Sequence, residues 1–134
     1  WQRIVDGFET KLVGSCSQGL SKPAASIDEL VNEYCSAQVF LNTSTISPVP
    51  SCLLEAMSCG CAVVTTATCM IPEIIEHGVN GFMSNNEGYI QQLLDDEELR
   101  TKMGNAARET IVNNFSEEEF INNWNNIFKR AYGV

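Results

Sequence analysis

The fold is decided by residues 44–64, which read STISPVPSCLLEAMSCGCAVV. Two prolines mark a loop, Ser51 opens a short helix, and Gly60 ends that helix. The residues that follow, 62–66, are typical of a buried strand. This order places a helix N-terminus at the carboxyl edge of a parallel sheet, where open α/β folds bind the phosphates of their ligands. An acidic side chain, Glu55, lies one turn inside the helix.

Strands and helices alternate on both sides of this stretch. Strands are expected at residues 9–13, 38–42, 62–66 and 82–83. Helices are expected from residue 26 onward, at 51–59, 72–76, 87–94 and 97–113, and from 116 onward. The alternation predicts an α/β fold with a Rossmann-like parallel sheet and flanking helices. A complete nucleotide-binding half has about six strands. We therefore expect a sheet that is incomplete at its start.

Two helix starts carry capping boxes, Ser26 with Glu29 and Ser116 with Glu119. The last helix also has apolar residues at helical spacing, and we call them the apolar stripe. Its members are Phe120, Trp124, Ile127, Phe128 and Ala131. The stripe is larger than a small sheet needs, so we expect part of it to contact another domain or a second copy.

Composition limits the classes of function. The 134 residues form at most one domain, with 44% apolar residues and a net charge of −9. That charge argues against nucleic acid and against anionic membrane surfaces as partners. No apolar run is long enough for a transmembrane segment, and no signal peptide is recognised. We therefore expect a cytoplasmic location.

The six cysteines invite a metal or disulfide interpretation. They lack paired C-x-x-C spacing, and the chain has a single histidine, so neither a zinc site nor a disulfide framework is expected. We predict reduced cysteines that are mostly buried, and no metal site. Cys52 begins a helix, which favours a lowered pKa of its thiol. Without a nearby histidine, a nucleophilic role for it is not expected.

Several segments together resemble the group 1 (family 4-like) glycosyltransferases of GT-B architecture. The match runs from about Ser26 to the end of the chain. It includes AMSCG at residues 56–60, IPEII at 71–75, GVNGF at 78–82, and the tail around Gly104 and Ala107. The resemblance implies the C-terminal, donor-binding domain of such an enzyme, covering residues 1–134. A separate N-terminal domain or a second subunit would then be the missing partner.

The resemblance also implies roles for individual residues. Glu55 would accept hydrogen bonds from the ribose hydroxyls of a nucleotide-sugar donor, and the N–H groups of Cys52 and Leu53, where Ser51 starts the helix, would face its diphosphate. Physical chemistry agrees, because first-turn N–H groups lack intrahelical partners and carboxylates bind vicinal hydroxyls strongly. The alternative is that Glu55 only stabilises its own helix. Ser47 stands where the family has a first glutamate that contacts the donor sugar.

A second set of candidates comes from loops. Gly14 and Ser15 follow the first expected strand at the same sheet edge, and the resemblance suggests that they border the donor. His77, in a glycine-rich turn, is expected to be an ordinary surface residue. The cations that family members use for the diphosphate are missing. Lys11 and Lys22 are available, but no pattern assigns them.

The sequence therefore favours part of a glycosyltransferase that moves a sugar from a nucleoside diphosphate to an acceptor. No cofactor is expected besides this substrate, and no catalytic residue is assigned. The 134 residues alone are not expected to turn over. One alternative is a catalytically silent binding or scaffolding domain that kept the fold. Another is a nucleotide-sugar epimerase, which the single histidine disfavours.

Overall fold

The computed structural model describes residues 5–14, 21–84 and 86–133. Its helices and strands follow one another as α1 (Ile27–Ser36), β1 (Val39–Asn42), α2 (Ser51–Ser58), β2 (Ala62–Thr65), the 3-10 turn η1 (Ile71–Glu73), β3 (Phe82–Met83), α3 (Glu87–Asp95), α4 (Glu97–Asn114) and α5 (Glu117–Tyr132). The three strands form one parallel sheet in the order β1-β2-β3. The α/β fold with a parallel sheet is confirmed.

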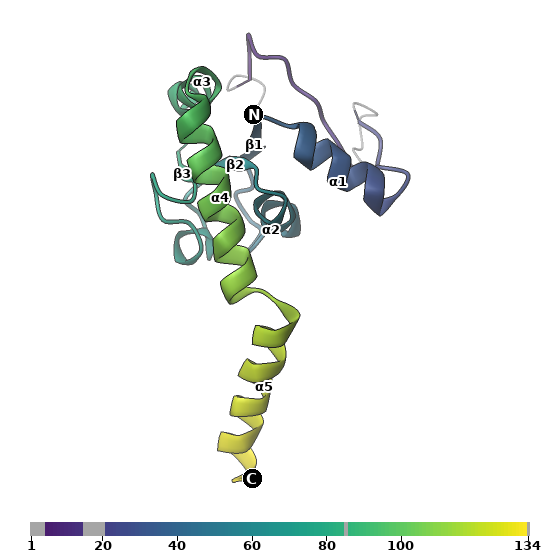
Figure 1. Ribbon diagram of the computed structural model, residues 1–134, viewed down its shortest axis with the longest axis vertical. Coiled ribbons are helices and arrows are strands. Elements are labelled where there is room, and N and C mark those ends of the chain that lie inside the picture. Colours follow the sequence, from purple (N-terminus) through teal and green to yellow (C-terminus); the bar gives the residue numbers. More distant parts are fainter. Residues whose placement is uncertain (1–4, 15–20, 85, 134) are drawn as a thin grey trace.

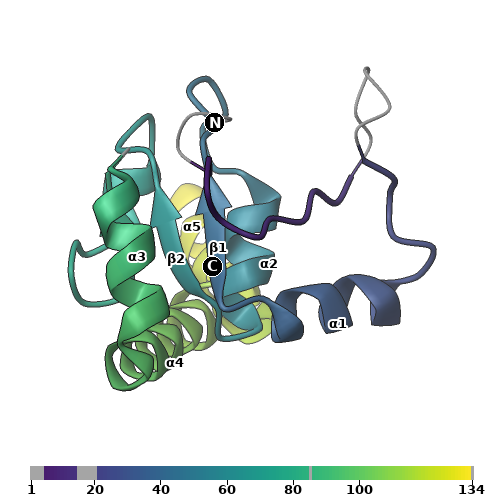
Figure 2. The ribbon, with the colours of Figure 1, turned by 90° about the horizontal axis from the view of Figure 1, so that it is seen from above.

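The sheet is covered on both faces, so its central strand is buried along its whole length. Val63 points to one face and packs with Leu53 and Met57 of α2 and with Ala107 of α4. The alternate face carries a second cluster, which contains Ala62, Val64, Phe82, Ile90, Leu93 and Met103. Figure 2 shows α2 and α3 on opposite sides of β1 and β2. The alternation of side chains along β2 therefore supplies both halves of the core.

Two glycines allow α4 to lie against the turn between α2 and β2. Gly60 has a φ of +79°, which is a backbone conformation that side chains other than glycine rarely adopt. The backbone of Gly104 comes so close to it that a Cβ atom at residue 104 would lie 2.1 Å from the Gly60 carbonyl oxygen. Gly60 of the AMSCG segment thus follows the end of α2 and also forms part of the contact with α4.

A buried amide fixes the turn before β3 to α4. The Asn80 Oδ1 atom accepts from the Glu76 N–H at 2.8 Å. Its Nδ2 group donates to the Ile74 carbonyl at 3.0 Å and to the Thr110 hydroxyl oxygen at 2.9 Å. One asparagine side chain therefore joins two backbone groups of this turn to a hydroxyl of α4.

The first and last helices lie outside this core. Ser26 and Ser116 accept hydrogen bonds from the N–H groups of Glu29 and Glu119, so the serine half of each predicted capping box is confirmed. Neither α1 nor α5 contains a buried residue, and α5 projects away from the sheet (Figure 1). The apolar stripe is exposed, with Trp124 44% and Phe128 49% accessible. Its contact with another domain or a second copy stays a prediction.

Two expected elements differ in the structure. Residues 9–13 were expected to form a strand, but only Val13 pairs, through an isolated bridge to Lys22. A strand requires a neighbour, and among the described residues this segment has no strand of the sheet beside it. The expected helix at 72–76 is only the short turn η1, which ends at Glu73 with Ile74 as its C-cap.

Candidate functional site

The loop between β1 and α2 lies at the carboxyl edge of the sheet. Hydrogen bonds to the end of β2 and to the residues after it fix this loop. The Asn42 side-chain amide donates to the Thr65 hydroxyl oxygen at 2.8 Å, and its Oδ1 atom accepts from the Ser44 N–H at 3.2 Å. The hydroxyls of Thr66 and Thr68 both donate to the Ser44 carbonyl, that of Thr68 at 3.1 Å. The start of α2 is thereby fixed relative to the strand ends.

The first turn of α2 has no side-chain cap. Pro50 occupies the N-cap position and contributes no side-chain hydrogen bond. The Leu53 N–H donates to the Pro50 carbonyl at 3.0 Å, and the Leu53 side chain is fully buried. The N–H groups of Ser51 and Cys52 donate to no other described residue, although that of Cys52 also approaches the sulfur of its own side chain. Of the two amides predicted to face a diphosphate, that of Cys52 has no partner in another residue and that of Leu53 is in use.

Glu55 lies one turn further along α2 and is exposed to solvent. Its Oε2 atom accepts a hydrogen bond from the hydroxyl of Tyr34, on α1, at 3.0 Å. Its Oε1 atom has no hydrogen-bond donor in the described part of the chain. Desolvation and then the adjacent Glu55 carboxylate raise the pKa of Tyr34, so the phenol stays protonated and remains a donor. One oxygen of the Glu55 carboxylate is thus hydrogen-bonded to Tyr34, and the other has no donor among the described residues.

The thiol of Cys52 does not have the lowered pKa that its position suggested. Burial is the largest effect and raises the pKa of Cys52, and the charge of Glu55 raises it further. Hydrogen bonds from the backbone at the helix start oppose this rise but do not overcome it. The helix-start prediction was wrong because desolvation outweighs the helix N-terminus at this site.

The expectation of mostly buried cysteines was also wrong. Of the described cysteines only Cys61 is buried, whereas Cys35 and Cys69 are exposed. Cys35 lies on α1, which has no buried residue, and Cys69 lies in the turn after β2 at a φ of +52°. All five described cysteines are free thiols.

Of the remaining predicted residues, Ser47 lies in the loop before α2, whereas Gly14 makes its hydrogen bonds to other parts of the chain. Ser47 is half-buried in the loop before α2, next to Pro48, whose carbonyl accepts from the Met70 N–H at 3.1 Å. Gly14 is held elsewhere, by its own N–H to the Lys22 carbonyl at 3.0 Å and by the Ser21 hydroxyl at 2.7 Å. Ser15 lies outside the described residues.

The chain around Gly14 is anchored on α1 rather than on α2. Lys11, one of the two cations noted in the sequence, pairs with Glu33 of α1. His77 is exposed, as expected, and its Nδ1 atom accepts from the Met83 N–H at 3.0 Å. The structure therefore brings Ser47, Ser51, Cys52 and Glu55 together at the start of α2. No hydrogen bond or ion pair among the described residues joins Gly14 to them.

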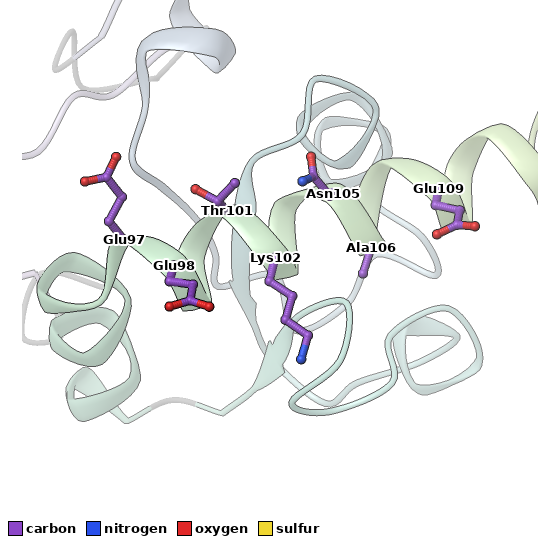
Figure 3. Close-up of a pocket in the computed structure, with 7 residues that line it drawn as sticks. All are labelled: Glu97, Glu98, Thr101, Lys102, Asn105, Ala106 and Glu109. Carbon is purple, nitrogen blue, oxygen red and sulfur yellow. The ribbon is translucent and has the colours of Figure 1, made fainter.

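A shallow hollow runs along the outer surface of α4, and Figure 3 shows the seven side chains that line it. All of them come from this one helix, from Glu97 to Glu109, and none is a predicted site residue. Within the described ranges no group of three or more His, Cys, Asp or Glu side chains is arranged to hold a metal ion. None of the helices described is both long and apolar enough to cross a membrane.

Sequence reasoning missed several residues that shape the site. Tyr34, Asn42, Thr66 and Thr68 orient Glu55 or the loop before α2. Polar residues at the ends of apolar strands are the available signal for Asn42 and Thr66. No local pattern indicates Tyr34, because it contacts Glu55 across 21 residues of sequence.

Comparisons with known proteins show which family the chain belongs to. The sequence profile of the family described as glycosyl transferases group 1 matches residues 22–110. N-acetyl-alpha-D-glucosaminyl L-malate synthase from Bacillus anthracis is 38% identical over 82 residues, which are 57% of this chain and 22% of the relative. The chain spans less than a third of the length of the curated relatives it matches.

Solved structures show the same fold. HepE from Anabaena, solved in complex with UDP, matches 67% of this chain and 26% of its own with a TM-score of 0.58 and 27% identity. The C-terminal domain of a group 1 glycosyl transferase from Francisella tularensis matches 72% of this chain and 54% of its own, with a TM-score of 0.58 and 21% identity. The profile and the parallel sheet therefore show that this chain belongs to the group 1 glycosyltransferases and has the Rossmann-like fold of their GT-B architecture.

Proposed function

We propose that this chain is the donor-binding part of an enzyme that transfers a sugar from a nucleoside diphosphate to an acceptor. One observation carries the proposal: α2 begins after the carboxyl end of β1 with N–H groups that donate to no other described residue, and the same helix carries the exposed carboxylate of Glu55. The UDP bound to HepE supports a nucleotide ligand. The family match does not favour a catalytically silent scaffold.

In this proposal the two ends of the donor nucleotide use different chemistry. The N–H groups of Ser51 and Cys52 and the dipole of α2 attract the diphosphate, which compensates locally for a net charge of −9. The Glu55 carboxylate would repel a phosphate beside it, so it reaches past the diphosphate to the ribose hydroxyls. Charge-assisted hydrogen bonds from these hydroxyls hold the nucleoside.

The same site would assist the reaction by stabilising the diphosphate as it leaves. Charge develops on the leaving group, and donors fixed in advance stabilise that charge better than water does. Ser47 is neutral, so its contribution to the donor sugar is limited to hydrogen bonding. We propose that acceptor-binding and catalytic groups come from a further domain, as expected for a chain that spans only part of its relatives.

Titration calorimetry with UDP and GDP tests the proposal. Replacing Glu55 by glutamine keeps the size of the side chain but removes its charge, and we expect nucleotide binding to weaken by about 10-fold or more. Glu98→Gln, on the outer surface of α4, is the matched control and should leave binding unchanged. The proposal fails if neither nucleotide binds to the native chain, or if Glu55→Gln binds as tightly as the control.

A further inference from the structure

We propose that Tyr34 is a positioning residue that holds the Glu55 carboxylate in the orientation needed for ribose binding. The inference rests on the proposed function, since it assigns a task to a neighbour of the ribose-binding group. It concerns a contact between two elements that lie far apart in sequence, α1 and α2. Tyr34 is not a catalytic residue in this proposal, because it acts on the nucleotide only through Glu55.

The geometry of the contact is specific. The Tyr34 hydroxyl donates to Glu55 Oε2 at 3.0 Å, which is within the range of a normal hydrogen bond. It engages one carboxylate oxygen and leaves Oε1 without a donor among the described residues. A carboxylate has lone pairs on both oxygens, so Oε1 remains available for a ligand hydroxyl. The contact therefore orients Glu55 without saturating it.

The tyrosine ring is itself fixed by packing. Helix α1 has no buried residue, yet the half-buried Tyr34 ring packs against the core cluster formed by α2, β2 and α4. It meets the ring of Phe40 edge to face, with centroids 5.8 Å apart and an angle of 66° between the planes. An aromatic side chain has few rotatable bonds, so this packing also sets the direction of the hydroxyl.

Other groups do not substitute for Tyr34 around Glu55. The one ion pair found among the described residues joins Lys11 and Glu33, so no described cation holds the Glu55 carboxylate. Burial and the Glu55 charge together raise the pKa of Tyr34, which keeps its proton at any physiological pH. Tyr34 is thus a permanent neutral donor that orients the carboxylate without cancelling its charge.

The test compares Tyr34→Phe with the native chain by titration calorimetry with UDP. Phenylalanine keeps the ring and its packing on Phe40 and removes only the donor. We expect UDP binding to weaken by about 3- to 10-fold, as for the loss of one hydrogen bond to a charged group. Tyr132→Phe, on the exposed end of α5, is the matched control and should bind UDP as the native chain does. Circular dichroism confirms that each variant is folded.

Two further measurements separate positioning from a general structural effect. With 2′,3′-dideoxy-UDP, which lacks the ribose hydroxyls, Tyr34→Phe and the native chain should bind equally. In a Glu55→Gln background, Tyr34→Phe should cause no additional loss. An equal loss with both nucleotides, or full additivity with Glu55→Gln, overturns the inference in favour of a packing role.

The outcomes also distinguish this inference from the proposed function. If UDP binds and Glu55→Gln weakens it while Tyr34→Phe does not, the inference is wrong and the proposed function stands. If UDP does not bind, or if Glu55→Gln has no effect, the proposed function is wrong and the inference falls with it.

Discussion

Replacing Gly104 with alanine tests the backbone contact on which the position of α4 depends. The added Cβ atom would lie 2.1 Å from the Gly60 carbonyl oxygen and 3.1 Å from its carbonyl carbon. Carbon–oxygen contacts in proteins are normally about 3.3 Å or longer. Both partner atoms belong to the backbone and cannot rotate away. Helix α4 would therefore have to move outward by roughly 1 Å.

The energetic cost follows from what that movement disturbs. Met103 and Ala107 flank Gly104 on α4, and both are almost fully buried against the sheet. Overpacking of this kind costs about 1–3 kcal/mol of stability and occasionally more. Because both contacting atoms are backbone atoms, we expect a cost of about 3–4 kcal/mol from overpacking at this site. Alanine is a better helix former than glycine by about 1 kcal/mol. We therefore expect the free energy of unfolding to fall by about 2–3 kcal/mol.

Urea denaturation followed by circular dichroism at 222 nm measures this change. For a typical dependence on urea, the midpoint should fall by about 1–2 M. Asn105→Ala is the matched control, because residue 105 is the exposed neighbour on the same helix. It should be neutral or slightly stabilising, by about 0.5 kcal/mol. A Gly104→Ala protein as stable as the native chain, beside a well-behaved control, would refute the close approach of α4 to Gly60.

Two other predictions concern the exterior and the interior of the domain. Trp124→Gln should change the free energy of unfolding by less than about 0.5 kcal/mol, because the side chain lies on the projecting helix α5. Leu53→Ala, in the core, should lower the free energy of unfolding by about 2–5 kcal/mol. Equal effects of the two substitutions in urea denaturation would contradict the arrangement of α5. Burial raises the pKa of Cys61 to about 12, so this thiol ionises at a lower pH in the unfolded chain than in the folded one, and its contribution to the free energy of unfolding should fall by about 1 kcal/mol between pH 7.5 and 10. Urea midpoints at the two pH values measure this loss, and a Cys61→Ala protein should lose less over the same interval.

Local sequence signals were sufficient for most of the secondary structure. The capping boxes at Ser26 and Ser116 correctly marked two helix starts, and the expected strands at 38–42 and 62–66 each contain an observed parallel strand that is one residue shorter. Residues 9–13 have the composition of a strand, but composition does not say whether a partner strand lies beside them. Elements were predictable where the decisive interactions are close in sequence.

The site was predictable only in outline, for the same reason. The motif predicted that a helix starting at Ser51 carries Glu55, and the structure has α2 at Ser51–Ser58. The partner of Glu55 and the direction of the Cys52 pKa shift both depend on three-dimensional surroundings. A helix start favours a thiolate, but burial disfavours it, and the sequence gives no measure of how deeply the thiol is buried.

The hydrogen bonds of the buried Asn80 amide protect a sequence that is prone to deamidation. Asn80 precedes Gly81, and an asparagine followed by glycine deamidates readily when its backbone is free to move. In the folded chain the Asn80 side chain is tied to Glu76, Ile74 and Thr110, which keeps it out of the reactive geometry. In an unfolded chain an aspartate or isoaspartate would form at this position and, on refolding, would place a negative charge beside the Ile74 carbonyl oxygen, which needs a donor. Time spent unfolded would then progressively destroy the capacity to refold.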